Sequence, residues 1–108
     1  MGTYDIHDNE IFENQISENG YRMLDCASFY ENETIVGEGI VMNLMNGLPR
    51  DDLFVTSKVW PGQVENIEEA CLDTLDALGL KQLDLYLVHW PVAMKKIVMG
   101  DGKTEGYE

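Results

Sequence analysis

The sequence predicts an α/β fold in which a parallel sheet is covered by helices. Segments with strand character alternate along the chain with segments of helical period, which is the pattern of strand–helix–strand units. Polar residues also recur at regular intervals, because Asp25 and Lys58 are 33 residues apart and Lys58 and His89 are 31 apart. One strand–helix–strand unit takes about 30 residues, so this spacing places successive strand ends on one rim of the sheet.

A helix is expected before the first strand. Asp8 can cap its N-terminus and Gly20 can end it. Ile11, Phe12 and Ile16 recur at helical spacing, so we expect them to face the sheet. The sequence signal for this helix is weaker than that for the two later helices, since the segment is rich in asparagine and glutamate.

Three strands are expected, at residues 22–27, 53–58 and 83–89. Each segment is short and nearly continuous in apolar or β-forming residues. Such runs are typical of parallel strands that are buried on both faces. The strand ends therefore carry the polar residues named above.

Two longer helices are expected between the strands, at residues 32–46 and 64–78. Asn32 stands at the N-cap position of the first helix, and Gly47 and Pro49 should end that helix. Gly79 should end the second helix. An apolar stripe on each helix should face the sheet. The two stripes consist of Val36, Ile40 and Leu44, and of Ile67, Cys71, Leu75 and Leu78.

The composition disfavours several classes of function. A formal net charge of -13, with only 7 Lys and Arg residues, argues against nucleic acid or an anionic membrane surface as partner. No apolar run approaches the roughly 18 residues that a membrane helix needs, and no secretory leader opens the chain, so we expect a cytosolic protein. Cys26 and Cys71 are too few for a disulfide framework and are interpreted as reduced core residues.

Three segments of the sequence read GYRMLDCA at residues 20–27, followed by Tyr30, then LFVTSKVW at 53–60 and LDLYLVHWP at 83–91. Together these segments resemble the aldo-keto reductases. The resemblance runs from Gly2, Thr3 and Tyr4, which are similar to the end of the family's first strand, to the loop after Pro91. It implies one partial (β/α)8 TIM barrel domain over residues 1–108, with roughly the first four β/α units and a clipped first strand. A closed barrel takes about 250 residues, so we expect this chain to represent the N-terminal half of such an enzyme.

The resemblance implies reduction of a carbonyl compound by hydride from NADPH, with four catalytic residues. Tyr30 would donate the proton, Lys58 would sit beside it, Asp25 would pair with Lys58, and His89 would donate a hydrogen bond to the substrate oxygen. Elementary chemistry supports these roles. A phenol has a reference pKa of about 10, so a nearby ammonium is needed to stabilise the tyrosinate that forms.

The resemblance also implies binding residues. The small-molecule carbonyl substrate would be walled by Tyr4, Trp60, His89 and Trp90. The cofactor would be contacted by Gly2, Thr3, Tyr4 and Asp25. Aromatic walls suit an apolar or aromatic carbonyl, although Tyr4 and Met23 depart from the residues more usual in the family. No metal is expected in the site.

Each site residue also has a structural explanation when it is taken singly. Lys58 could be solvated, Tyr30 could cover the core, Asp25 could accept a strand-end hydrogen bond, and His89 could lie in the core. The alternative to an enzyme is therefore an inactive fragment or a non-enzymatic binding or regulatory module.

A partial barrel would also leave open sheet edges and exposed apolar residues, so self-association is expected. His7 lies outside every motif and is expected at the surface.

Overall fold

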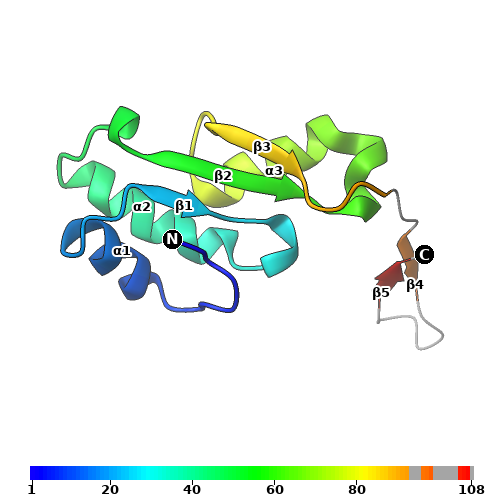
Figure 1. Cartoon of the computed structure of the whole chain (residues 1–108), viewed down its shortest axis with the longest axis horizontal. Coiled ribbons are helices and arrows are strands. Elements are labelled where there is room, and N and C mark those ends of the chain that lie inside the picture. Colours follow the sequence, from blue (N-terminus) through cyan, green and yellow to red (C-terminus); the bar gives the residue numbers. More distant parts are fainter. Residues whose placement is uncertain (93–95, 99–104, 108) are drawn as a thin grey trace.

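The computed structural model describes residues 1–92, 96–98 and 105–107 of the 108-residue chain. Strands and helices alternate along it (Figure 1). The main elements are α1 (Asn9–Ser17), β1 (Met23–Asp25), α2 (Glu33–Met45), β2 (Phe54–Val59), α3 (Ile67–Leu78) and β3 (Leu85–Val88). Short 3-10 helices are η1 (Ser28–Tyr30), η2 (Arg50–Asp52) and η3 (Pro61–Asn66). A separate antiparallel pair consists of β4 (Lys96–Val98) and β5 (Glu105–Tyr107).

The main sheet is parallel, with the strand order β1-β2-β3. Gly2 forms an isolated parallel bridge with Asp25, so the N-terminal residues run along the outer edge of β1. All three strands and both long helices predicted from the sequence are present. Their observed ends lie within about three residues of the predicted ones, the scale on which helix and strand assignments differ and predicted boundaries err.

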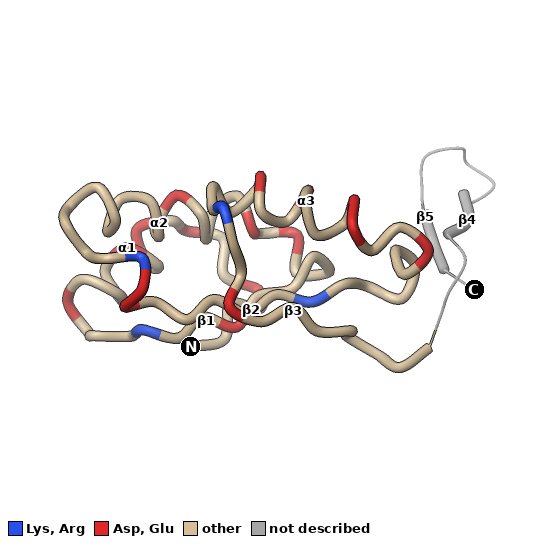
Figure 2. The backbone as a smooth tube through the Cα atoms, turned by 90° about the horizontal axis from the view of Figure 1, so that it is seen from above, with Lys and Arg blue, Asp and Glu red and all other residues tan. Residues whose placement is uncertain are grey.

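All three α-helices lie on one side of the sheet (Figure 2). Between the two layers is a cluster of buried apolar side chains. It consists of Phe12, Ile16, Leu24, Cys26, Val36, Ile40, Leu53, Val55, Leu78 and Leu80. The helices approach closely at Gly37, where a Cβ atom would stand 2.6 Å from the backbone oxygen of Leu78. A glycine at this position therefore permits the observed distance between α2 and α3.

Two residues predicted to face the core are exposed instead. Ile11 is 41% exposed, because Phe12 and Ile16, one turn apart, occupy the buried face of α1. Ile67 is 44% exposed, since the buried line of α3 runs through Ala70, Thr74 and Leu78. Leu78 is buried as predicted, but the buried Ala70 and Thr74 each precede a predicted stripe residue of α3, Cys71 and Leu75, by one position, which is about 100° around a helix.

The helix starts show how the chain satisfies its free backbone amides. Asp8 caps α1 as predicted, and its Oδ1 accepts a 3.0 Å hydrogen bond from the amide of Glu10. Asn32 stands at the N-cap of α2 but its side chain makes no capping bond. Its amide instead donates to the carbonyl oxygens of Thr3 at 2.6 Å and Ile6 at 2.8 Å. Asn32 thus fastens the N-terminal segment to α2, which the capping prediction did not foresee.

The sheet face opposite the helices is uncovered by the described residues. The strand register places Met23 beside Phe54, and Leu85 and Leu87 beside Thr56 and Lys58. Met23 is 56% exposed, and Phe54, Leu85 and Leu87 are exposed as well. Apolar side chains therefore line a face that has no packing partner within residues 1–92.

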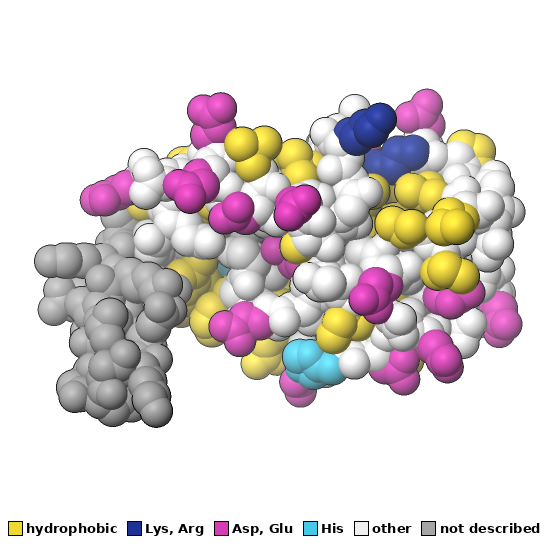
Figure 3. Space-filling model, turned by 180° about the vertical axis from the view of Figure 1, so that it is seen from behind, with side chains coloured by type: hydrophobic (Ala, Val, Ile, Leu, Met, Phe, Trp, Pro, Cys, Tyr) yellow, Lys and Arg dark blue, Asp and Glu magenta, His cyan; other side chains and the backbone are white. Residues whose placement is uncertain are grey.

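The outward side of the helix layer is rich in acidic side chains (Figure 3). The His7 side chain is exposed, and its Nε2 atom lies 3.4 Å from Asp5 Oδ1, so its predicted surface position is confirmed. Among the described residues, no helix is both long and apolar enough to cross a membrane.

Candidate active site

An ion pair joins the ends of β1 and β2. Lys58 Nζ lies 2.5 Å from Asp25 Oδ1 and donates a second hydrogen bond, of 3.0 Å, to the carbonyl oxygen of Cys26. The register pairs Asp25 with Thr56, two residues before Lys58, so both side chains project from the uncovered face of the sheet. The Lys58 side chain is only 14% exposed, whereas that of Asp25 is 52% exposed.

The pKa of Lys58 is raised above its ordinary value of 10.5. Burial of the ammonium acts in the opposite direction, but the hydrogen bond and negative charge of Asp25 outweigh it, with a smaller contribution from Tyr30. The side chain is therefore a fixed positive charge at neutral pH.

Tyr30 ends η1, immediately after the first strand-end loop. Its ring centroid lies 5.3 Å from Lys58 Nζ, within the range of a cation–π contact. Glu31, in the left-handed region with φ of 54°, turns the chain away after it. Tyr4 meets the Tyr30 ring edge to face, at a centroid distance of 5.3 Å.

His89 follows β3 and is tied to β2 by a 3.0 Å hydrogen bond from its backbone amide to the carbonyl oxygen of Val59. Its ring is perpendicular to that of Tyr30, with centroids 5.8 Å apart. Burial and then the charge of Lys58 lower the pKa of His89 below 6.5, against a smaller opposing effect of Asp25. The imidazole is therefore neutral at pH 7. Its Nδ1 atom is buried without a hydrogen-bond partner among the described residues.

Aromatic side chains surround the His89 ring. Trp60 lies 5.3 Å from it between centroids and Trp90 lies 6.3 Å from it. Phe29 stacks on Trp60 at 4.0 Å and meets His89 edge to face. Sequence reasoning missed Phe29, although its position directly before Tyr30 was a usable signal. The predicted wall residues Tyr4, Trp60, His89 and Trp90 are all present in this one aromatic group.

The N-terminal residues reach the site through the backbone of Asp25. Thr3 is fully buried and both its amide and its Oγ1 donate to the carbonyl oxygen of Asp25, at 3.1 and 3.0 Å. The structure thus brings Gly2 and Thr3 to Asp25 and brings Tyr4 to Tyr30. Their contact with a cofactor stays a prediction.

Two further polar residues were not foreseen. Ser28 Oγ donates a 2.8 Å hydrogen bond to Gln63 Oε1, and it also lies 3.2 Å from the carbonyl oxygen of Lys58. These partners are 30 and 35 residues from Ser28 in the sequence and belong to no motif, so no local pattern could have revealed them.

The charged and hydrogen-bonding groups at this rim could hold the reacting end of the cofactor that the resemblance implies, but they do not supply the cations that its phosphates need. Asp25, Lys58 and Tyr30 offer a charge and hydrogen-bonding groups to a reacting centre. Within residues 1–92 the other cations stand before the strands, at the opposite rim. They are Arg22 before β1, Arg50 before β2 and Lys81 before β3. Among those residues, therefore, only Lys58 brings a cation to the site.

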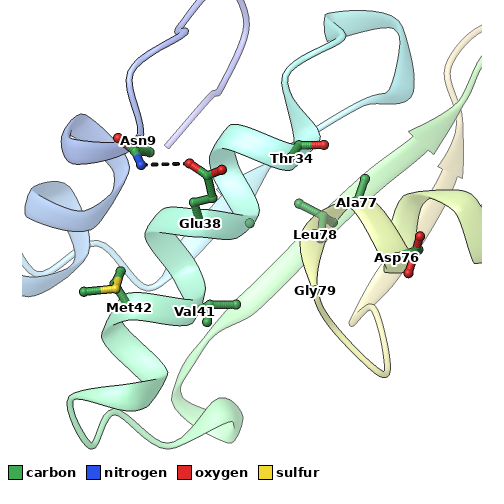
Figure 4. A pocket seen from close by; sticks show the side chains of 10 residues that line it. Asn9, Thr34, Glu38, Val41, Met42, Asp76, Ala77, Leu78 and Gly79 are labelled. Carbon is green, nitrogen blue, oxygen red and sulfur yellow. Dashed lines mark hydrogen bonds between the residues drawn. The ribbon is translucent and has the colours of Figure 1, made fainter.

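A groove of about 390 Å³ lies elsewhere, in the helix layer between α2 and α3 (Figure 4). Val41, Met42 and Leu78 contribute apolar surface, and Glu38 at its margin accepts a 2.8 Å hydrogen bond from Asn9. This groove in the helix layer is separate from the catalytic tetrad, by which we mean Asp25, Tyr30, Lys58 and His89, because Asp25 and Lys58 project from the opposite face of the sheet.

Comparison with known proteins places the chain among similar sequences and structures. A sequence model described as "Aldo/keto reductase family" matches residues 7–100. "Aldo-keto reductase family 1 member A1-A" of Danio rerio is 51% identical over 78 residues, covering 68% of this chain and 24% of that protein. "Aldehyde reductase YPR1" of Saccharomyces cerevisiae is 39% identical over 106 residues, covering 96% of this chain and 33% of that protein.

A solved structure shares the fold. The aldose reductase from Schistosoma japonicum superposes with a TM-score of 0.79 at 36% sequence identity, covering 100% of this chain and 39% of that one. The three parallel strands and their helices thus match part of a TIM barrel. The chain spans well under half the length of each of these relatives.

Proposed function

Because the chain belongs to the aldo/keto reductase family, we propose that it supplies the catalytic residues for NADPH-dependent reduction of an aldehyde or ketone to an alcohol. The observation that carries this proposal is the position of Lys58, paired with Asp25 at 2.5 Å and 5.3 Å from the Tyr30 ring. A charged lysine beside a tyrosine on a strand-end rim is the arrangement that proton donation by a phenol requires.

Tyr30 acts as the proton donor in this proposal. NADPH, when bound, supplies the hydride that reduces the carbonyl carbon. The Tyr30 hydroxyl gives its proton to the carbonyl oxygen, and the Lys58 ammonium stabilises the tyrosinate that remains. Asp25 holds that ammonium in place and charged, consistent with the raised pKa of Lys58.

His89 orients the substrate oxygen by donating a hydrogen bond from its neutral ring. Its lowered pKa supports the neutral form, and its perpendicular contact with Tyr30 puts both groups beside one another. The aromatic side chains around it favour an apolar or aromatic carbonyl compound. Tyr4 would contact the same substrate.

NADPH is the proposed cofactor, contacted by Gly2, Thr3, Tyr4 and Asp25 at its nicotinamide end. A relative named "NADP-dependent D-sorbitol-6-phosphate dehydrogenase" of Malus domestica, 42% identical over 82 residues, supports this choice. The phosphates would need cations beyond those of residues 1–92.

A cytosolic location belongs to the same proposal, and the free thiols of Cys26 and Cys71 agree with a reducing compartment.

Self-association is proposed through the open sheet edges, as expected from the sequence, and through the uncovered sheet face. The exposed Met23, Phe54 and Leu87 on that face favour burial against another surface. Sedimentation velocity over a concentration series tests this, and a monomer at every concentration would contradict it.

A purely binding or regulatory module is the second candidate, but the assembled tetrad favours catalysis.

The main proposal is tested by measuring NADPH binding to the purified chain with a fluorescence titration. Circular dichroism establishes that the chain is folded. Saturable binding in the micromolar range together with carbonyl-dependent NADPH oxidation is the expected result. Binding without turnover of any aldehyde or ketone would favour the binding module. A folded chain that neither binds nor turns over would overturn the proposal for this chain.

A further inference from the structure

We propose that Ser28 and Gln63 are positioning residues that hold Tyr30 against Lys58. The pair of these two side chains is called the Ser28–Gln63 joint below. The inference deepens the proposed reductase function and rests on it, because it assigns the joint a role in the geometry of the same proton transfer.

The joint fixes η1, the three-residue helix that Tyr30 ends, to the end of β2. Ser28 is the first residue of η1, and its Oγ lies 2.8 Å from Gln63 Oε1 and 3.2 Å from the carbonyl oxygen of Lys58. A serine hydroxyl carries one hydrogen, so these two acceptors share it. Ser28 is therefore anchored to the backbone of the residue whose ammonium serves Tyr30.

Gln63 links Ser28 to Trp60, one of the aromatic residues of the site. Its Oε1 atom also accepts a 3.1 Å hydrogen bond from the backbone amide of Trp60, and the backbone amide of Gln63 donates to the Trp60 carbonyl oxygen at 2.8 Å. One carboxamide oxygen thus receives donors from both η1 and the Trp60 backbone. The stack of Phe29 on Trp60, at 4.0 Å and 12° between planes, joins the same two segments.

The joint acts through Tyr30 and not on the reacting atoms. Ser28 bonds to Gln63 and to the Lys58 backbone, while the Lys58 ammonium itself is engaged by Asp25. Loss of the joint leaves the Asp25–Lys58 pair and the Phe29–Trp60 stack in place and loosens η1. Because a displacement of about 1 Å in a reacting group can reduce turnover about 100-fold, even a partial release should be measurable.

Enzyme kinetics of single variants test the joint. Ser28→Ala and Gln63→Ala should each lower kcat about tenfold while the Kd for NADPH stays unchanged, and the double variant should lose no more than either alone. Gln63→Glu keeps the oxygen acceptors and should restore most of kcat. Ser17→Ala, at an exposed position of α1, is the matched control and should leave kcat unchanged. Unchanged kcat in Ser28→Ala, or additive losses in the double variant, would overturn the proposal.

A readout without turnover separates this inference from the proposed function. Nuclear Overhauser contacts between the Tyr30 ring and the Lys58 side chain should weaken in Ser28→Ala and persist in Ser17→Ala. If the unmodified chain shows no turnover, the reductase proposal fails and these contacts alone decide the joint. If Ser28→Ala does not fold, Gln63→Ala is measured in its place, since Gln63 lies only partly buried in η3. Contacts of unchanged intensity would refute the joint.

Discussion

The buried carboxylate of Glu33 accepts a 2.6 Å hydrogen bond from Ser57, the residue directly before Lys58. Its other oxygen accepts a 3.0 Å bond from Thr74 of α3. One side chain at the start of α2 therefore joins β2 to α3 on the helix side of the sheet. Burial raises the pKa of Glu33 above 4.5, and the hydrogen bonds from Ser57 and Thr74 only partly oppose this.

Glu33→Gln should reduce the dependence of stability on pH. A carboxyl with a raised pKa in the folded state binds its proton more tightly there, so its contribution to stability is complete below 4.5 and is lost as pH rises through the raised pKa. The unfolding free energy of the native chain, from urea titrations across this window, should therefore fall more than that of Glu33→Gln. Glu38→Gln, at an exposed position of the same helix, is the control. Equal slopes for all three chains would refute this account of Glu33.

Tyr30→Phe should abolish carbonyl reduction and leave NADPH binding intact. Only the proton donor is removed, and general acids contribute about 10²- to 10⁴-fold to rate. Steady-state turnover and cofactor titration measure the two effects separately. Tyr21→Phe, which removes an exposed phenol before β1, should retain full activity. Turnover retained in Tyr30→Phe would assign the proton to another group.

Lys58→Met should lower kcat roughly 10²- to 10³-fold, the loss associated with one electrostatic stabiliser. The variant removes the ammonium while keeping much of the apolar stem, so folding measured by circular dichroism should change little. Lys81→Met, at an exposed residue before β3, controls for the loss of charge alone. A kcat unaffected by Lys58→Met would exclude its charge from the reaction.

Gly37→Ala should destabilise the fold by about 1–3 kcal/mol, since the added methyl group would overlap with backbone and not with a mobile side chain. The nearest atom, Leu78 O, would lie 2.6 Å from it. Thermal unfolding should shift downward by several degrees for a domain of this size. Thr34→Ala on the exposed side of α2 should shift it far less. An unchanged midpoint would mean that α2 and α3 can separate without loss.

The sequence predicted the alternation of elements because buried parallel strands and amphipathic helices have distinct periods. It placed Asp25, Tyr30, Lys58 and His89 together, because consecutive strand ends of a parallel sheet meet on one rim, as they do here. Which residues of each helix face the sheet was harder to predict. Thr74 is buried by its bond to Glu33, and a hydropathy pattern assigns such a position to the surface.

The remaining errors share a physical origin. Asn32 stands at the N-cap as predicted, yet its side-chain amide donates to Thr3 and Ile6, 29 and 26 residues away, and makes no capping bond. Ser28 and Gln63 likewise lie 35 residues apart in the sequence and meet only in the folded structure. Hydrogen bonds between distant loops depend on tertiary geometry, which local periodicity does not encode.

The strand order β1-β2-β3 follows the order of synthesis. Each strand pairs with the one made before it, so no strand must wait for a partner encoded much later in the chain. Ribosomal synthesis is slow compared with loop closure and helix formation, and a unit can dock as it emerges. The sheet can therefore assemble vectorially from its N-terminal edge, and the Asp25–Lys58 pair can form before β3 joins the sheet.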